Sequence, residues 1–258
     1  MYDSHLLLVG SVVIKFFWLT MVSANLKNGH FYQGFALTLR APKHLFSINA
    51  RFDQGRFLMG VLVGKPAPDF TAAAVLGTGE IVDDFNLSAT IKGKKAVIFF
   101  YPLDFTFVCP SELLAHNNRV EEFQKRGVEL IGVSIDSHWT HNAWRNTPVE
   151  NGGIGEVAYT LVADINHAIC KAYDVESEGG VAYRGSFLID EDGLVRHQVV
   201  NDLPLGRNVD EMLRMVDALK FHQEHGEVCP AGWKEGDAGM KDSPEGVASY
   251  LSENASKL

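Results

Sequence analysis

The chain is 258 residues long, with 46% apolar and 21% charged residues. This balance suits one folded domain, or two small ones, with a buried core, and it excludes a disordered or fibrous protein. The formal net charge of −9 argues against nucleic acid as the main partner. Three cysteines without a CxxC motif exclude a disulfide scaffold, make a poor zinc site and are typical of a reducing compartment.

The first 58 residues differ in charge from the rest of the chain. They hold six basic and two acidic side chains, whereas the following 200 residues hold 17 and 30. The apolar run at 6–22 has no Lys or Arg before it, contains Lys15 and is short for a membrane span, which disfavours a signal peptide or an anchor. We predict that residues 1–58 lie outside the functional domain, as a start-site artefact or a disordered extension, and that the protein is cytoplasmic and not bound to a membrane.

From Met59 onward the pattern alternates strands and helices. Continuous apolar runs predict buried strands at 96–101 and 128–135, and helical spacing predicts a helix at 111–126 between them. Further elements are expected in chain order: a helix at 138–145, a strand at 159–162, a helix at 166–173, a hairpin of strands at 186–189 and 194–200, and a helix at 208–222. The sequence therefore predicts an α/β domain at 59–225.

The last segment, residues 226–258, is polar and rich in glycine. Its apolar side chains are few, and Val247, Tyr250 and Leu251 are the ones that could anchor it. We predict a peripheral C-terminal arm that packs on another surface.

The segment that joins the strand at 96–101 to the next helix carries the strongest sign of chemistry. Cys109 stands at the helix entrance beside Pro110, where the first turn has no need of an N–H group. Unpaired backbone N–H groups and the helix dipole favour a thiolate there, and Thr106 can direct its hydroxyl to the sulfur. A buried structural cysteine is the alternative, which the crowding of Pro102, Thr106 and Pro110 around Cys109 disfavours.

Pro102, Thr106 and Cys109, in the order P-x-x-x-T-x-x-C, resemble the peroxidatic motif of the peroxiredoxins. The similarity extends over residues 61–258. The matching segments are 64–70, 183–185, 200–207 and 225–233, and the last resembles the resolving-cysteine segment of the typical 2-Cys branch. The resemblance implies a thioredoxin-like fold and the reduction of hydrogen peroxide and organic hydroperoxides without a metal or another cofactor. It also implies homodimers that assemble into decameric rings.

The same resemblance implies roles for residues at the first step. Cys109 attacks the peroxide, while Thr106 and Arg184 hold it and stabilise charge on the leaving oxygen. Pro102 keeps bulk water away. Arg196 is expected to pair with Glu112 and to orient Arg184. A simple interaction of Glu112 with the helix dipole remains open.

A second step is implied for Cys229. The resemblance places this resolving cysteine on the arm of the partner subunit, where it closes an interchain disulfide, Cys109–Cys229, with the oxidised Cys109. Thioredoxin is the first choice of electron donor, and a flavin-dependent disulfide reductase is the second. A thiol–disulfide oxidoreductase is disfavoured because Glu112 stands where a CxxC motif would need its second cysteine. A redox-dependent chaperone built from stacked rings remains compatible.

Two other groups of residues need an interpretation. Cys170 matches no motif and is flanked by apolar residues, so we expect a buried helical thiol; His138 and His141 lack a third metal ligand, so we expect packing or surface positions. The sequence Gly-Gly-Ile-Gly at 152–155 and the pair Tyr250-Leu251 resemble motifs of easily overoxidised peroxiredoxins, with one departure in each. They indicate sensitivity to overoxidation.

Overall fold

The computed structural model describes residues 60–258, apart from the side chain of Lys257, so the predicted extension at 1–58 lies outside the described residues. The elements follow in the order β1 (Thr71–Val75), β2 (Ile81–Asn86), α1 (Leu87–Thr90), β3 (Lys95–Phe100), α2 (Cys109–Asn117), α3 (Val120–Lys125), β4 (Val128–Ser134), α4 (His138–Arg145), η1 (Val149–Asn151), β5 (Thr160–Ala163), α5 (Ala168–Ala172), β6 (Arg184–Ile189), β7 (Val195–Asn201), α6 (Val209–His225), α7 (Pro244–Asn254) and η2 (Ala255–Lys257). The expected alternation of strands and helices is confirmed.

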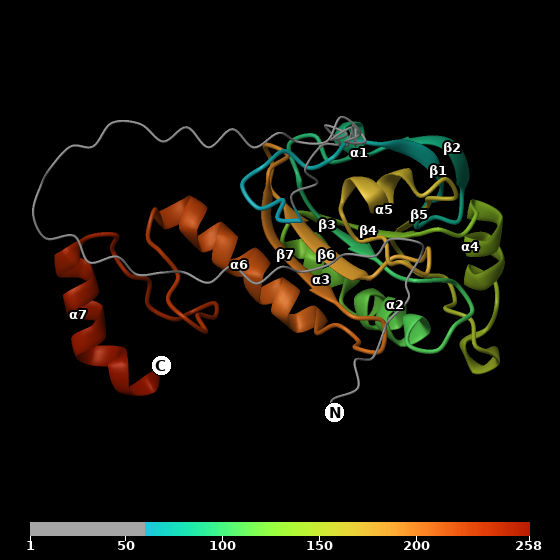
Figure 1. Ribbon diagram of the computed structural model, residues 1–258. Coiled ribbons are helices and arrows are strands. Elements are labelled where there is room, and N and C mark those ends of the chain that lie inside the picture. The colour runs from blue at the N-terminus through green and yellow to red at the C-terminus, as the bar shows by residue number, and fades with distance from the viewer. Residues whose placement is uncertain (1–59) are drawn as a thin grey trace, which may run out of the picture. The chain divides into compact units, whose positions relative to one another are not determined.

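Within residues 60–258, seven strands form one mixed sheet in the order β2-β1-β5-β4-β3-β6-β7. β3, β4 and β5 are parallel to one another, and the other pairs are antiparallel. β3 is buried at every position, as its continuous apolar run predicts. Figure 1 shows helices on both sides of this sheet.

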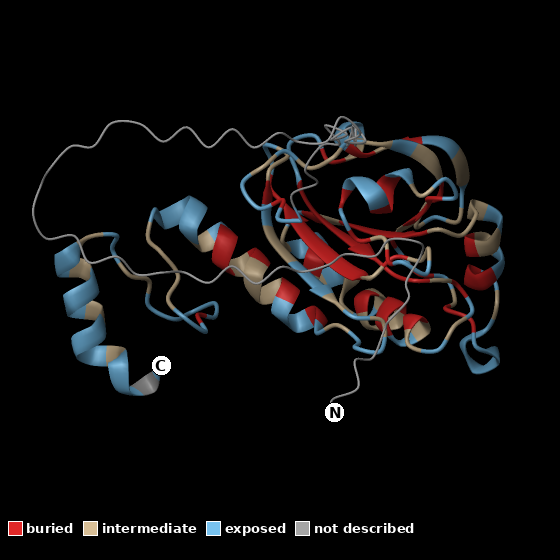
Figure 2. Cartoon of the chain, viewed as in Figure 1, coloured by how far each residue is buried: buried red, intermediate tan, exposed pale blue. Residues whose placement is uncertain are grey.

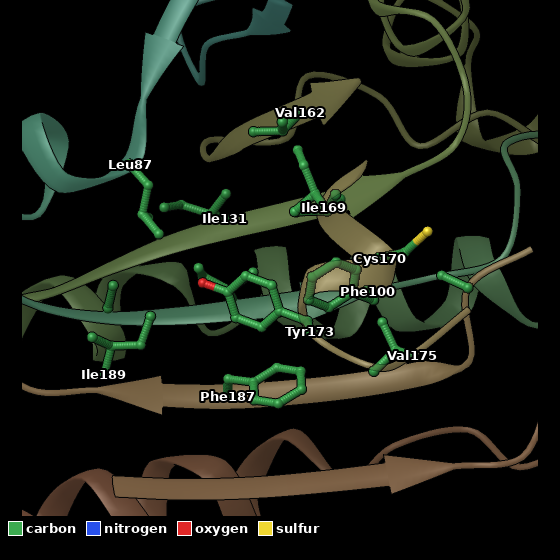
Figure 3. Packing of buried hydrophobic residues seen from close by; sticks show 14 of the residues in the cluster. Leu87, Phe100, Ile131, Val162, Ile169, Cys170, Tyr173, Val175, Phe187 and Ile189 are labelled. Carbon is green, nitrogen blue, oxygen red and sulfur yellow. The ribbon is translucent and has the colours of Figure 1, made fainter. Parts of the chain in front are cut away.

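Alternate side chains of β3 enter two separate cores. Phe100 packs on one face with Tyr173, which directly follows α5, and with Phe187 of β6, as Figure 3 shows. Phe99 faces the other core, which includes Leu113 of α2 and buried residues of α3, α4 and α6. Because successive residues of a strand point to opposite faces, one strand organises both cores.

The predicted helix at 111–126 is two helices, α2 and α3, with a break at Asn118 and Arg119. The side chain of Asn117 accepts a hydrogen bond from the backbone N–H of Ala158 at 2.8 Å, and Arg119 pairs with Asp210 at the start of α6. These tertiary contacts favour the break over the continuous helix that the apolar spacing predicts.

The first hairpin, β1 and β2, and the short helix α1 have no counterpart among the predicted elements. β1 is mostly alanine, and β2 carries two aspartates, so neither has the β-branched and aromatic composition of a strong strand signal. Their pairing comes from the sheet: β1 lies between β2 and β5, which supply its hydrogen bonds on both sides.

The arm at 226–258 begins after α6, which ends at Gly226 in a left-handed conformation with φ of 68°. Trp233 is buried and its ring packs on Phe221 of α6 with centroids 4.8 Å apart. By contrast α7 has no buried residue, and Figure 2 shows it in the colours of exposed and intermediate residues. Over residues 60–258 no helix has both the length and the apolar character that crossing a membrane requires.

Candidate active site

Cys109 is the first residue of α2 and is 1% exposed. Its Sγ lies 3.0 Å from Thr106 Oγ1 and 3.5 Å from Arg184 Nη1. The Thr106 hydroxyl also lies 2.8 Å from the carbonyl oxygen of Leu103, so its one proton can be donated to either acceptor. The structure therefore brings together the thiol, the hydroxyl and the guanidinium that the sequence singles out.

A buried polar network fixes the loop that carries Thr106. The Asp104 carboxylate accepts the hydroxyl proton of Tyr101 at 2.8 Å and contacts His141 Nδ1 at 2.7 Å. The backbone N–H of Asp104 donates to Asp136 at 2.9 Å. Burial is the main cause that raises the pKa of both Tyr101 and Asp104. Because the network joins the loop to α4 and to Asp136 after β4, it holds the loop in one conformation.

Pro102 and Phe105 lie in this loop and differ in exposure and in backbone conformation. Pro102 is buried, which agrees with a water-excluding position. Phe105 has a left-handed φ of 52° and is 52% exposed, with its ring centroid 5.7 Å from that of Trp144. A positive φ is uncommon for a bulky residue, so the loop holds strain beside the thiol.

Arg184 enters the site from the first position of β6 and is 4% exposed. Its Nε donates to the carbonyl oxygen of Leu203 at 2.7 Å, and its Nη1 donates to Glu112 Oε2 at 2.6 Å. The same Nη1 reaches the sulfur of Cys109. Glu112, one turn into α2, therefore binds Arg184 directly.

The prediction that Arg196 pairs with Glu112 is wrong. Arg196 instead pairs with Asp190 at 3.0 Å, and its side chain is 36% exposed. The register of the β6–β7 hairpin explains this: Arg184 pairs with Asn201, so Arg196 lies toward the turn at the opposite end of the hairpin. It cannot reach Glu112 while Arg184 does.

Arg207, which follows β7 and precedes α6, takes the position expected for Arg196. Its backbone N–H and Nε each donate to Glu112 Oε1 at 3.0 Å, and its Nη2 donates to Oε2 at 2.9 Å. Its Nη1 donates to the carbonyl oxygens of Phe100 and Gly185 at 2.6 and 3.0 Å. Every donor group of this buried side chain has a nearby acceptor, as a buried charge requires. In the sequence, the one signal that could have identified Arg207 is its place at the end of the matching segment 200–207.

The charges around the thiol do not cancel. Arg184 and Arg207 bring two guanidinium groups to one carboxylate, Glu112, and all three are buried. One positive charge is left to stabilise negative charge on the sulfur of Cys109.

His116, one turn after Glu112 on α2, adds no charge to this cluster. Its ring stacks on Phe99 with centroids 3.9 Å apart, and Arg207 lies over the same Phe99 ring at 5.2 Å. Burial, with the Arg207 charge second, lowers the pKa of His116 to about 3. His116 is therefore neutral at physiological pH.

Cys229 lies apart from these groups in the arm, where it is partly buried and its Sγ is 3.4 Å from the carbonyl oxygen of Ala218 in α6. It borders a cavity of about 270 Å³ whose lining includes Leu188 and Leu219. Burial raises the pKa of its thiol, and the Arg214 charge opposes that change. All three cysteines of the chain are free thiols.

Three other residues were singled out in the sequence: Cys170, His141 and His138. Cys170 is buried on α5, as expected. His141 is fully buried, bonded to Asp104 and 3.2 Å from the carbonyl oxygen of Val162, so its position is one of packing. His138 contacts the ring of Trp139, with centroids 4.7 Å apart.

The Gly-Gly-Ile-Gly segment at 152–155 is tightly packed. A Cβ atom at Gly153 would lie 1.8 Å from the carbonyl oxygen of Thr147, so no other residue fits there. Trp144 Nε1 donates to the carbonyl oxygen of Gly152 at 2.9 Å, and Ile154 is buried. Sensitivity to overoxidation stays a prediction.

Comparisons with known proteins agree with this geometry. The model of the AhpC/TSA family matches residues 63–198, and that of the C-terminal domain of 1-Cys peroxiredoxin matches residues 218–253. The alkyl hydroperoxide reductase C of Helicobacter pylori is 59% identical over 198 residues, which cover 77% of this chain and 100% of that protein. Peroxiredoxin-1 of Gallus gallus is 52% identical over 191 residues, which cover 74% of this chain and 95% of that protein.

Solved structures lead to the same family. The reduced 2-Cys peroxiredoxin of Plasmodium vivax superposes with a TM-score of 0.72 and 48% identity, covering 74% of this chain and 99% of that one. The expected thioredoxin-like fold is thereby confirmed. The matches to family, relatives and structure agree with the thiol site, and the chain belongs to the AhpC/TSA family: it is a peroxiredoxin, a thiol-dependent peroxidase.

Proposed function

We propose that Cys109 is the peroxidatic nucleophile and that Thr106 and Arg184 bind and activate the peroxide at its sulfur. The observation that carries this proposal is the convergence of Thr106 Oγ1 and Arg184 Nη1 on Cys109 Sγ at 3.0 and 3.5 Å. A nucleophile flanked by preorganised donors is what displacement at a peroxide oxygen needs.

The chemistry balances at the first step. The thiolate of Cys109 attacks the terminal oxygen, a sulfur–oxygen bond forms and the oxygen–oxygen bond breaks. Cys109 is oxidised to a sulfenic acid, and the leaving oxygen takes a proton to become water or an alcohol. The guanidinium of Arg184 offsets the negative charge that develops on that oxygen, and buried Pro102 limits the access of bulk water.

Arg207 and Glu112 keep Arg184 in place during this step. Arg207 binds both oxygens of Glu112, and Glu112 in turn accepts from Arg184 Nη1 at 2.6 Å. A guanidinium held by a buried carboxylate has little freedom to turn away from the sulfur, so its geometry is set before peroxide arrives.

Cys229 is the resolving cysteine in this proposal. The thiol of Cys229 from the partner subunit attacks the sulfenic sulfur of Cys109, an interchain disulfide forms and water leaves. Support comes from the position of Cys229 in the C-terminal arm, where its thiol is partly buried and free, and from the similarity to a structure described as a 2-Cys peroxiredoxin. The match of 218–253 to a 1-Cys C-terminal domain favours a rival, in which an external thiol resolves Cys109 directly.

A homodimer that assembles further, to a decameric ring, is part of the proposal. β7 is at an end of the described sheet and exposes Val199 and Val200, so its free edge can pair with a second copy. Phe107 and Trp139 are 96% and 65% exposed, and apolar groups of that size on a surface favour a protein contact. A Plasmodium yoelii relative with a TM-score of 0.60 is described as forming an artifactual octamer when modified at its N-terminus.

The proposed reductant is thioredoxin, and a flavin-dependent disulfide reductase is the second choice. The proposed compartment is the cytoplasm, because the chain keeps three free thiols.

The test is peroxide consumption with each donor, for hydrogen peroxide and an organic hydroperoxide. Wild type should turn over with one donor and form a covalent dimer on a non-reducing gel after peroxide. A Cys229→Ser variant that still forms this dimer would refute the resolving role. A variant that forms no dimer and turns over with the same donor at the wild-type rate would refute it too, and would favour the 1-Cys scheme.

A further inference from the structure

We propose that His167, Cys170 and Glu176 form a binding site for one divalent metal ion of the zinc class, separate from the thiol that reduces peroxide. The three residues offer an imidazole nitrogen, a thiol sulfur and a carboxylate oxygen, and these atoms lie within 4.8 Å of one another. Nitrogen, sulfur and carboxylate oxygen are the ligands that zinc takes in proteins.

The distances suit a single ion. His167 Nδ1 and Glu176 Oε1 are 2.6 Å apart, joined by a hydrogen bond. Zinc bonds of about 2.0 to 2.3 Å in a tetrahedral arrangement place ligand atoms roughly 3 to 4 Å apart. A small opening of the His167–Glu176 pair and an equally small approach of the Cys170 sulfur would therefore admit the ion. A water molecule would take the fourth position.

The backbone holds the three ligands in this arrangement without the ion. The backbone N–H of Cys170 donates to Asp164 Oδ2 at 2.7 Å, and that of Val175 donates back to the carbonyl oxygen of Cys170 at 2.9 Å. His167 has a left-handed φ of 60°, which is uncommon for a residue other than glycine and sets the direction of its side chain. The cost of ordering the ligands is thus met in the fold itself.

The sulfur of Cys170 points away from the apolar side chains around it. Figure 3 shows Tyr173 and Phe100 in the core with the Cys170 sulfur directed away from them. Cys170 is 1% exposed, while the side chains of His167 and Glu176 are 27% and 22% exposed. An ion can therefore approach through the two outer ligands and meet the sulfur on the inside.

Binding requires a proton to leave. The ion forms a metal–sulfur bond as the S–H bond breaks, and the proton goes to solvent; nothing is oxidised or reduced. Because a proton is exchanged for the ion, affinity should be higher at pH 9 than at pH 7.

The ion would stabilise the segment that leads to Arg184. Glu176 forms an isolated bridge with Ala182, and the chain enters β6 at Arg184 two residues later. Lys171 Nζ lies 3.6 Å from Glu176 Oε2, which leaves Oε1 to face the ion. A metal would tie this hairpin to α5 and raise the thermal unfolding midpoint of the chain.

The test uses the full chain with Cys109→Ser and Cys229→Ser, so that Cys170 is the one remaining thiol. Cobalt(II) is added as the spectroscopic probe, followed by competition with zinc. We expect one cobalt per chain, a thiolate-to-cobalt charge-transfer band that zinc abolishes, and a higher unfolding midpoint with zinc. Adding Cys170→Ser should remove the band, and Glu176→Gln or His167→Gln should weaken binding more than about 100-fold, since changes to outer partners of ligands already cost 10- to 100-fold.

His225→Gln, a change of an exposed histidine elsewhere, is the matched control and should bind as the parent does. The proposal is overturned if no charge-transfer band appears at pH 9, or if the band survives the loss of Cys170. Should Cys170→Ser fold poorly, Glu176→Gln decides: binding equal to that of His225→Gln would contradict the site.

Discussion

The surroundings of Cys109 and Cys229 differ in almost every physical respect. Cys109 is 1% exposed and lies among buried, mutually bonded polar groups from β3, α2, β6 and the turn before α6. Cys229 is partly buried on an arm, and the one hydrogen bond of its thiol goes to the carbonyl oxygen of Ala218 at 3.4 Å. The first thiol is held in one geometry, and the second is weakly attached.

The difference follows from what each thiol is proposed to do. Attack on a peroxide needs donors that are in place beforehand, because reorganising them during the reaction would raise the barrier. Resolution needs a thiol that can leave its position and reach another sulfur, so few contacts are an advantage. Four changes test this contrast, the first with the largest expected effect.

Replacing Cys109 with serine removes the nucleophile itself. We expect peroxide turnover to fall by on the order of 10⁴-fold or more, as when an enzyme loses its nucleophile. The variant should keep its fold, since serine is similar in size. Turnover is measured with the donor identified for wild type, and near-ultraviolet circular dichroism checks the fold. Residual turnover within tenfold of wild type would show that the rigid site is not the reacting one.

Replacing Arg207 with glutamine tests the support behind the reacting atoms. Its loss leaves Glu112 Oε1 and the buried carbonyl oxygens of Phe100 and Gly185 without their side-chain donors, and each unsatisfied acceptor costs about 1 to 3 kcal/mol of unfolding free energy. We expect that loss in urea unfolding, together with slower peroxide reduction, and Arg207→Lys should recover only part of it. Arg196→Gln is the matched control: Arg196 is exposed, and its buried partner Asp190 keeps the backbone donors of Asp192 and Leu194, so stability should change by less than in Arg207→Gln. Equal effects of the two variants would contradict the assignment.

Replacing Thr106 with valine keeps the shape and removes the hydroxyl that faces the sulfur. Losing one donor to a reacting charge costs about 10² to 10³ in rate. Thr106→Ser keeps the donor and should retain most of the activity. The second-order rate constant with hydrogen peroxide, followed by stopped-flow fluorescence, distinguishes the two. If valine reacts as fast as serine, the 3.0 Å contact has no part in activating the thiol.

Replacing His116 with phenylalanine removes a titratable group from the core. In the fold the pKa of His116 is lowered to about 3, whereas the unfolded chain binds a proton near pH 6.5. Stability from this group is therefore present above pH 6.5 and is lost as the pH falls toward 3, by about 1.4 kcal/mol per pH unit. Urea unfolding between pH 7 and 5 should be less pH-dependent in His116→Phe than in wild type and in the exposed control His225→Gln. Identical slopes in all three would contradict the burial of a neutral His116.

Much of the fold follows from local patterns in the sequence. The apolar run at 96–101 and the spacing in 208–222 predict β3 and α6 because each element buries a continuous run or a stripe that a short window can reveal. The hairpin of β1 and β2 does not follow, since its alanines and aspartates carry no such pattern and the neighbouring strand β5 completes its pairing.

The site shows the same division. Cys109, Thr106 and Arg184 stand in motifs that can be read from the chain, and the structure brings their atoms together. The partner of Glu112 is Arg207 and not Arg196, because the register of the β6–β7 hairpin decides which arginine returns to the site. Register depends on strand pairing across the sheet, which no local window contains.

Mixing two complementary variants tests most directly whether the fixed thiol and the weakly attached one react across subunits. Cys109→Ser and Cys229→Ser chains, one carrying a tag that shifts its mobility, are dissociated, mixed, reassembled and treated with one equivalent of peroxide. We predict a disulfide that joins Cys109 of one chain to Cys229 of the other in the mixture, identified by peptide mass spectrometry, and none in either variant alone. A mixture without this disulfide, while wild type forms one within a single chain, would contradict the account.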